Sequence, residues 1–167
     1  MIEKIYRKYL EIESLEDFNE VKGLSENNSV DLVKPNDFQL NKFFYKNIGK
    51  NYYWKDRLIW DDFYWMDYIS NENLSTYVLK VNNEIAGYFE LIFNAVSKES
   101  EIVYLGILED YFGKKLGGFL LSEAIKISFS KGSSRVWVHT CSLDHKNALN
   151  NYLSRGMKIF KSETLIR

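Results

Sequence analysis

Hydrophobic and polar residues alternate along several short segments of the chain and follow a helical repeat along others. Alternation over Thr76–Val81 and over Glu84–Phe93 predicts two strands. The Asn82-Asn83 pair between them tolerates the left-handed backbone of a tight turn, so the two strands should pair antiparallel. Further strands are expected over residues 6–13, 101–108, 135–139 and 157–166.

The clearest helical repeat places apolar side chains on one face between Leu116 and Ile127, and Lys131-Gly132 suits the end of that helix. A second repeat begins at Asp144 and stops at Gly156. Other helices are expected after Ser14, from Pro35 to Phe44 and from Trp60 to Ile69. Because a helix separates the strands at 101–108 and 135–139, those strands should run parallel through a crossover.

Length and composition favour one domain over residues 1–167, large enough to bury roughly 70% of its unfolded surface. The net charge is −1 and no basic run is present, so nucleic acid is not an expected partner. One cysteine, Cys141, excludes an internal disulfide and is compatible with a reducing compartment. The start of the sequence does not resemble a signal peptide and no apolar run could span a membrane, so we expect a cytoplasmic protein.

A turn rich in glycine and lysine joins the strand at 101–108 to the helix that follows it. The first N–H groups of a helix attract anions, and Gly113, Gly117 and Gly118 lack the Cβ atoms that would keep a phosphate away. Lys114 and Lys115 add positive charge. The glycine spacing fits neither a dinucleotide fingerprint nor a P-loop. A different phosphorylated cofactor is expected, the alternative being an ordinary tight turn with solvent-exposed lysines.

This turn is similar to the motif Arg/Gln-x-x-Gly-x-Gly/Ala when aligned over residues 112–117, with Phe112 at the Arg/Gln position and Lys115 at the first Gly. Downstream, Ala148, Tyr152 and Gly156 match the pattern N-x-x-A-x-x-x-Y-x-x-x-G-F. Two other positions of that pattern differ, since His145 replaces Asn and Met157 replaces Phe. Over roughly residues 54–163, the motifs and the order of elements resemble the GNAT superfamily of acetyl-CoA-dependent N-acyltransferases.

The resemblance implies an α/β (mixed α+β) fold. Its central sheet would be mixed, mostly antiparallel and of six to seven strands, flanked by helices, with a splayed parallel pair in the middle. Residues 1–95 would form the acceptor side and residues 96–167 the acyl-CoA-binding half. The implied co-substrate is acetyl-CoA, and no metal is expected.

The resemblance also assigns residues to the cofactor. Backbone groups of the central strand would bind the thioester carbonyl and the pantetheine amides, and the turn and the following block would bind the rest. The cofactor-binding residues are then Gly106, Ile107, Leu108, Gly113, Lys114, Lys115, Leu116, Gly117, Gly118 and His145.

Acetyl transfer to an amine requires a neutral nucleophile and a proton for the leaving thiolate. Glu101 lies at a position that resembles the position of the general base in histone-type members of the family. Glu90 is the other candidate for the base. A solvent-exposed carboxylate at a strand end is the alternative for Glu101. Tyr152 is the expected general acid, because the pKa of a phenol, about 10, is close to the pKa of a thiol, about 8.5, so proton transfer to the thiolate meets only a small mismatch. The alternative is that Tyr152 is a structural tyrosine of the core.

Aromatic residues are dense between Phe43 and Tyr68 and are interleaved with aspartates. Most such residues form a core, but aromatic faces with carboxylates also suit a cationic amine. Trp60, Tyr64 and Glu90 are therefore candidate substrate-binding residues. A polyamine, an aminoglycoside-like molecule or a peptide amine would fit such a site.

His139, Cys141, Asp144 and His145 lie close together in the sequence but do not form a standard zinc set. We therefore expect neither a metal nor a Cys141 acyl-enzyme, but direct transfer in a ternary complex. Two interpretations from other classes stay open: a non-catalytic acyl-CoA-binding or regulatory domain, favoured by Phe112 and Lys115, and an aromatic N-terminal half that mediates protein interaction or homodimerisation.

Overall fold

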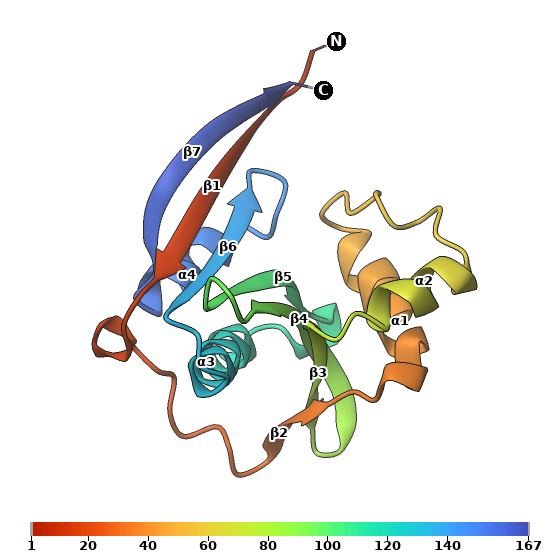
Figure 1. The fold of residues 1–167 in the computed structure, drawn as a ribbon, viewed down its shortest axis with the longest axis horizontal. Coiled ribbons are helices and arrows are strands. Elements are labelled where there is room, and N and C mark those ends of the chain that lie inside the picture. Colours follow the sequence, from red (N-terminus) through yellow and green to blue (C-terminus); the bar gives the residue numbers. More distant parts are fainter. Residues whose placement is uncertain (1, 167) are drawn as a thin grey trace.

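The computed structural model describes residues 2–166, except the side chain of Pro35. Seven strands form one sheet in the order β2-β3-β4-β5-β6-β1-β7 (Figure 1). The strands are β1 (Lys4–Ile12), β2 (Asn28–Leu32), β3 (Leu74–Val81), β4 (Glu84–Asn94), β5 (Glu99–Ile107), β6 (Arg135–Cys141) and β7 (Lys158–Ile166). The helices are α1 (Phe38–Gly49), α2 (Asp62–Ile69), α3 (Leu116–Ser130) and α4 (Ala148–Ser154), with single 3-10 turns η1 (Leu15–Asp17), η2 (Pro35–Asp37) and η3 (Glu109–Tyr111).

Strands β5 and β6 are the parallel neighbours, and every other neighbouring pair in the sheet is antiparallel. Their pairing covers Glu99 to Glu101 of β5 and ends there, so the two strands separate beyond Glu101. On the other side of β5, Leu91 of β4 pairs with Ile102 and Glu90 pairs with Tyr104. The intervening residue of β5 is therefore the extra residue of a β-bulge. The expected mixed sheet with a splayed parallel pair is confirmed.

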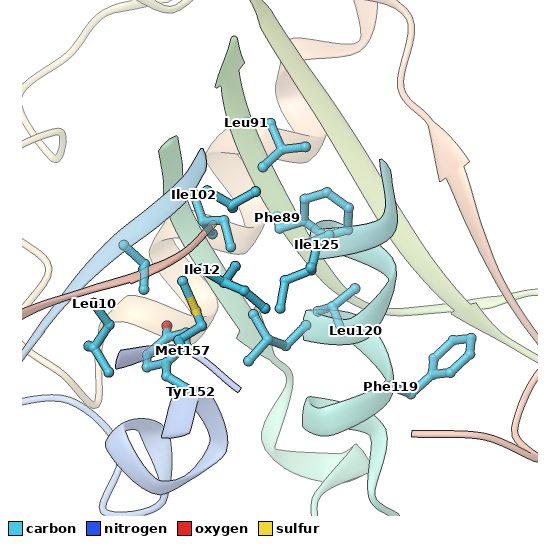
Figure 2. Close-up of a cluster of buried hydrophobic side chains, with 14 of the residues drawn as sticks. Leu10, Ile12, Phe89, Leu91, Ile102, Phe119, Leu120, Ile125, Tyr152 and Met157 are labelled. Atoms are coloured by element: carbon cyan, nitrogen blue, oxygen red, sulfur yellow. The ribbon is translucent and has the colours of Figure 1, made fainter. Parts of the chain in front are cut away.

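Each face of the sheet is covered by a helical layer. On one face, α3 presents Leu120, Ala124 and neighbouring residues to buried side chains from β1, β4, β5 and β6 (Figure 2). On the other face, Phe44 and Ile48 of α1 pack on Val78 and Tyr88. Figure 1 shows β1 and β7 continuing as a two-stranded arm beyond β6. These layers leave the C-terminal ends of β5 and β6 between α3 on one side and the loop after α1 on the other.

Three features of the structure differ from the sequence expectations. No pattern predicts strand β2, because Asn28–Leu32 is short, mostly polar and at the sheet edge. The helix expected from Asp144 begins at Ala148, because the Asp144 carboxylate accepts hydrogen bonds from the Thr140 hydroxyl and the Cys141 N–H and so holds a turn. The helix expected after Ser14 is one 3-10 turn.

Within residues 2–166, none of the helices combines the length and the apolar character needed to cross a bilayer.

Candidate active site

A cavity of about 1490 Å³ opens where β5 and β6 separate. Its walls come from five parts of the chain: residues 102–107 of β5, the η3–α3 turn with the start of α3, the end of β6 with residues 143–148, the inner face of α4, and the α1–α2 loop. The β1–β7 arm and Val21, Lys22 and Leu24 complete the lining. The cavity therefore lies at the point that the topology leaves open.

One end of this cavity is formed by the η3–α3 turn. Gly113 has φ +81° and Lys115 has φ +61°, so both adopt left-handed backbone that favours glycine. Lys115 is the N-cap of α3, and no side chain caps the first N–H groups of the helix. A Cβ at Gly117 would meet only the Asn151 amide nitrogen, at 3.7 Å. This helix start is therefore open to close approach by an anion.

We expect Lys115→Gly to stabilise the fold and weaken anion binding at the same time. Glycine removes the cost of the left-handed conformation, about 1 kcal/mol, so the thermal unfolding temperature should rise. The variant keeps the backbone of the turn but removes an ammonium group from the cavity lining. Affinity for coenzyme A, measured by calorimetry, should fall about two- to fivefold.

Lys98→Gly is the matched control, because Lys98 also has positive φ, at +56°, but lies in the β4–β5 turn away from the cavity. It should give the stability gain without a change in affinity. Tighter coenzyme binding by Lys115→Gly would show that Lys115 obstructs the site.

Three aromatic side chains connect the walls of the cavity. His145 lies edge-on to Phe112, with ring centroids 5.2 Å apart, and also contacts Tyr52 of the α1–α2 loop at 6.0 Å. The N–H of Asn147 donates to Nδ1 of His145, which leaves Nε2 to carry the ring proton. Phe112 therefore makes an apolar contact where the GNAT motif has a polar side chain, and His145 lines the cavity as a wall residue.

The β5 edge that faces the cavity carries backbone groups without a neighbouring strand. Gly106 and Ile107 line the cavity, whereas Leu108 is not part of the lining and donates its N–H to the Ala86 carbonyl at 2.8 Å. A Cβ at Gly106 would lie 2.7 Å from Cγ2 of Ile48, so glycine here lets α1 pack directly on β5. An extended ligand can add to this edge as a strand would.

Tyr152 lines the cavity from α4. It is 7% exposed and packs in the same core as Leu10 and Met157 (Figure 2). Burial, and then the charge of Asp144, raise the pKa of Tyr152 well above its ordinary value. The phenol therefore stays protonated at neutral pH and keeps a proton that it can donate.

Glu101 lies at the last residue pair between β5 and β6, opposite Trp137. Its side chain is half-buried, and burial raises the pKa of the carboxyl group. The lining begins with the next residue, Ile102, so Glu101 borders the cavity without lining it.

Glu90 does not face the cavity but lies in a buried polar cluster on the α1 side of the sheet. It is fully buried and pairs with Arg57, whose Nη1 lies 3.1 Å from Oε1. The Tyr68 hydroxyl donates to Oε1 and the Asn41 amide donates to Oε2 at 2.9 Å. A carboxylate held in this way has no free position for a substrate proton, so its geometry favours a structural role.

Arg57, for which no sequence pattern suggested a role, is the centre of this cluster. It is 6% exposed and its guanidinium lies 4.3–5.5 Å from the centroids of five aromatic rings, those of Tyr45, Trp60, Trp65, Tyr68 and Tyr104. Burial by itself would lower the pKa of Arg57, but the charge of Glu90 together with the neighbouring tyrosines outweighs burial, and the pKa is raised. Because residues 52–56 precede Arg57 and line the cavity, the cluster anchors one cavity wall.

Trp60 and Tyr64 pack against each other with tilted rings, centroids 4.5 Å apart, and do not line the cavity. Trp60 instead covers Arg57, and Tyr64 is 58% exposed. The structure thus places the three candidate substrate-binding residues around Arg57 or outside it, whereas residues 52–56 line the cavity. Ile59 and Phe63 are also exposed nearby, and an interaction surface there stays a prediction.

The His139 and Cys141 side chains both line the cavity, as strand alternation predicts. Burial raises the pKa of the Cys141 thiol and lowers the pKa of His139, so neither group is tuned toward a thiolate–imidazolium pair. Within the described residues, no group of three His, Cys, Asp or Glu side chains could hold a metal ion.

Lys114, a candidate phosphate-binding residue, is outside the cavity lining, and its ammonium group lies over the Tyr111 ring.

The sequence matches the model of the acetyltransferase (GNAT) family over residues 38–157. Because this match spans most of the chain and the fold agrees with it, the protein belongs to the GNAT family of N-acetyltransferases. Enzymes of this family use acetyl-CoA to acetylate amine acceptors. Among curated protein sequences, none matches this chain.

Solved structures support the fold at low sequence identity. A GCN5-related N-acetyltransferase from Sphaerobacter thermophilus superposes with a TM-score of 0.73 at 14% identity, covering 97% of this chain and 50% of that one. An aminoglycoside acetyltransferase from an uncultured soil metagenomic sample gives 0.65 at 18% identity, covering 80% and 90%. A functionally unknown conserved protein from Staphylococcus epidermidis gives 0.65 at 17%, covering 99% and 62%. The chain thus spans about half to two thirds of the first and last of these proteins.

Proposed function

We propose that this protein transfers the acetyl group of acetyl-CoA to a primary amine of a small molecule or peptide, by direct attack in a ternary complex. The observation that carries the proposal is the cavity between β5 and β6, which joins an uncapped helix start at one end to a free strand edge in the middle. The first feature suits phosphates and the second suits the amides of pantetheine. Together they match the two halves of coenzyme A.

The chain offers a defined set of groups to the coenzyme. The N–H groups of Leu116 and Gly117, with the Lys115 ammonium, would hold the diphosphate. The backbone of Gly106 and Ile107 would hold the pantetheine arm and orient the thioester carbonyl. When bound, acetyl-CoA supplies the activated acetyl group.

Proton movement is assigned to two side chains. Glu101 would accept the amine proton through water, since it borders the cavity one residue from the lining. Tyr152 would donate to the thiolate, since it lines the cavity and its raised pKa keeps it protonated. No covalent enzyme intermediate is needed, which agrees with a half-buried Cys141 thiol whose pKa is raised.

Titration calorimetry with acetyl-CoA, followed by thiol release with a panel of amines, tests this function. The panel should contain a diamine, an aminoglycoside, an amino acid and a peptide with a free N-terminus. We expect binding of the coenzyme and amine-dependent thiol release with at least one acceptor class. Binding without turnover on any amine would favour the non-catalytic alternative, and absence of binding would refute the proposal.

We expect Glu101→Gln to reduce kcat/KM about fivefold at pH 7, about 1 kcal/mol of barrier, because water then accepts the amine proton without a carboxylate. Burial raises the pKa of Glu101, so the wild-type profile should lose activity as pH falls, with a midpoint above the ordinary value of about 4.3. The variant should lack that acidic limb. Glu99→Gln is the control, because Glu99 lies two residues before Glu101 on the same face of β5. If Glu101→Gln still loses activity at low pH as the wild type does, another group is the base.

A further inference from the structure

Arg155, the C-cap of α4, lies against the first turn of α3. A Cβ at Gly118 would be 2.3 Å from Arg155 Nη1 and 2.8 Å from Cγ2 of Val21. The absence of a side chain at Gly118 therefore makes room for the guanidinium beside the helix start. Both residues line the cavity.

The position of Arg155 is fixed by its backbone. The N–H of Asn19 donates to the Arg155 carbonyl at 3.0 Å, and the Asn19 side-chain amide donates to the Ser154 carbonyl at 2.9 Å. Next to it, Asn151 of α4 donates to the Gly117 carbonyl at 3.1 Å, which joins α4 directly to the first turn of α3. The arginine is thus held at the helix start from two sides.

The guanidinium itself lacks an anionic partner in the described part of the chain. Its one side-chain hydrogen bond is a long contact of 3.5 Å from Nη1 to Oδ1 of Asn151, and its Nε is buried without an acceptor. No carboxylate forms an ion pair with it among residues 2–166. Partly buried charges normally have a partner, so this arrangement suits an anion that comes from outside the chain.

The surroundings favour a negatively charged ligand. Lys22 and Lys115 line the same cavity, and the uncapped N–H groups of α3 add positive potential. A planar guanidinium with free N–H groups can hold two oxygens of one phosphate at once. The turn has Phe112 at the position where the GNAT motif has Arg or Gln, so a guanidinium from α4 can replace that missing polar group.

We propose that Arg155 binds a phosphate group of coenzyme A beside the N-terminus of α3. This inference rests on the proposed function. The diphosphate and the 3′-phosphate of the coenzyme share the required chemistry, and comparison of coenzyme A with 3′-dephospho-coenzyme A distinguishes them. Gly118 contributes to the same site, because it leaves the space that the guanidinium occupies.

Titration calorimetry should be run with both coenzymes on the wild type, Arg155→Met, Arg155→Lys and Lys158→Met. Arg155→Met keeps much of the side-chain volume but removes the charge, and should weaken coenzyme A binding at least about tenfold, the value of one charge-assisted contact. Arg155→Lys keeps the charge without the planar fork and should lie between wild type and Arg155→Met. Lys158→Met removes one exposed positive charge outside the cavity lining and should leave affinity unchanged.

Each outcome of this experiment supports or overturns a stated claim. A loss with coenzyme A alone assigns Arg155 to the 3′-phosphate, and an equal loss with both ligands assigns it to the diphosphate; either supports the inference. Wild-type affinity of Arg155→Met for both ligands overturns it. Failure of the wild type to bind either coenzyme would instead refute the proposed function. If Arg155→Met does not fold, as judged by circular dichroism, wild-type affinity of Arg155→Lys is the result that overturns the inference.

Discussion

Replacement of Arg57 by Met is expected to destabilise the protein by about 3–5 kcal/mol, because Glu90 would then be a fully buried charge without its cation. For a chain of this size, that loss corresponds to a fall in melting temperature of about 10 °C. The two hydrogen bonds from Tyr68 and Asn41 would remain, but neither carries a positive charge. Thermal and urea unfolding, followed by circular dichroism, measure the effect.

The matched comparison is Lys126→Met, which breaks the exposed ion pairs with Glu20 and Glu123 and should cost no more than about 1 kcal/mol. Combining Arg57→Met with Glu90→Gln removes both charges and should recover part of the stability lost by Arg57→Met alone. If the double variant is no more stable than Arg57→Met, the loss comes from aromatic packing around the guanidinium and not from the unpaired carboxylate.

Tyr152→Phe is expected to lower kcat at least tenfold, about 1.4 kcal/mol of barrier, while KM for acetyl-CoA changes little. The hydroxyl is the only group removed, so the packing of the ring against Met157 and its neighbours is kept. Because the raised pKa keeps Tyr152 protonated, its ionisation should not cause a loss of wild-type activity between pH 7 and pH 9. Steady-state thiol release across that pH range measures both expectations.

Tyr77→Phe provides the control for this variant. Tyr77 stacks on Phe89 at a distance from α4 and is not part of the cavity lining, so loss of its hydroxyl should leave kcat unchanged. A Tyr152→Phe protein that folds as the wild type and keeps its kcat would remove Tyr152 from the mechanism and leave it as a core residue.

The open helix start that we propose as the anion-binding end could be predicted from the sequence because it depends on the backbone. Glycines at 113 and 117, followed by an apolar helical repeat, are by themselves enough to indicate an open helix start. Likewise, a helix between two strand patterns predicts the parallel β5–β6 pair, since the crossover fixes strand direction. These features depend on residues close together in the chain.

The side-chain arrangement could not be predicted in the same way, because it depends on contacts between distant elements. Glu90 lies in a strand pattern that suggests access to substrate, yet Arg57, 33 positions away, covers it. Of the two aromatic residues that suggested an acceptor site, Trp60 covers that arginine and Tyr64 is exposed. The position of the Arg155 guanidinium depends on the space left by Gly118, which belongs to another helix. A charged residue next to the helix-ending Gly156 was the one sequence signal available for it.

Helix α3 packs on β4 and β5 and also on β6, so it spans the line along which the sheet divides. Beyond Glu101 no strand pairing holds β5 and β6 at a fixed separation, so their separation there depends on the packing of α3 against both strands. The helix whose first turn is the proposed phosphate site therefore also sets the width of the gap between the two strands. Substitutions on its sheet-facing side, remote from any ligand, would consequently change which acyl chain lengths the gap accommodates.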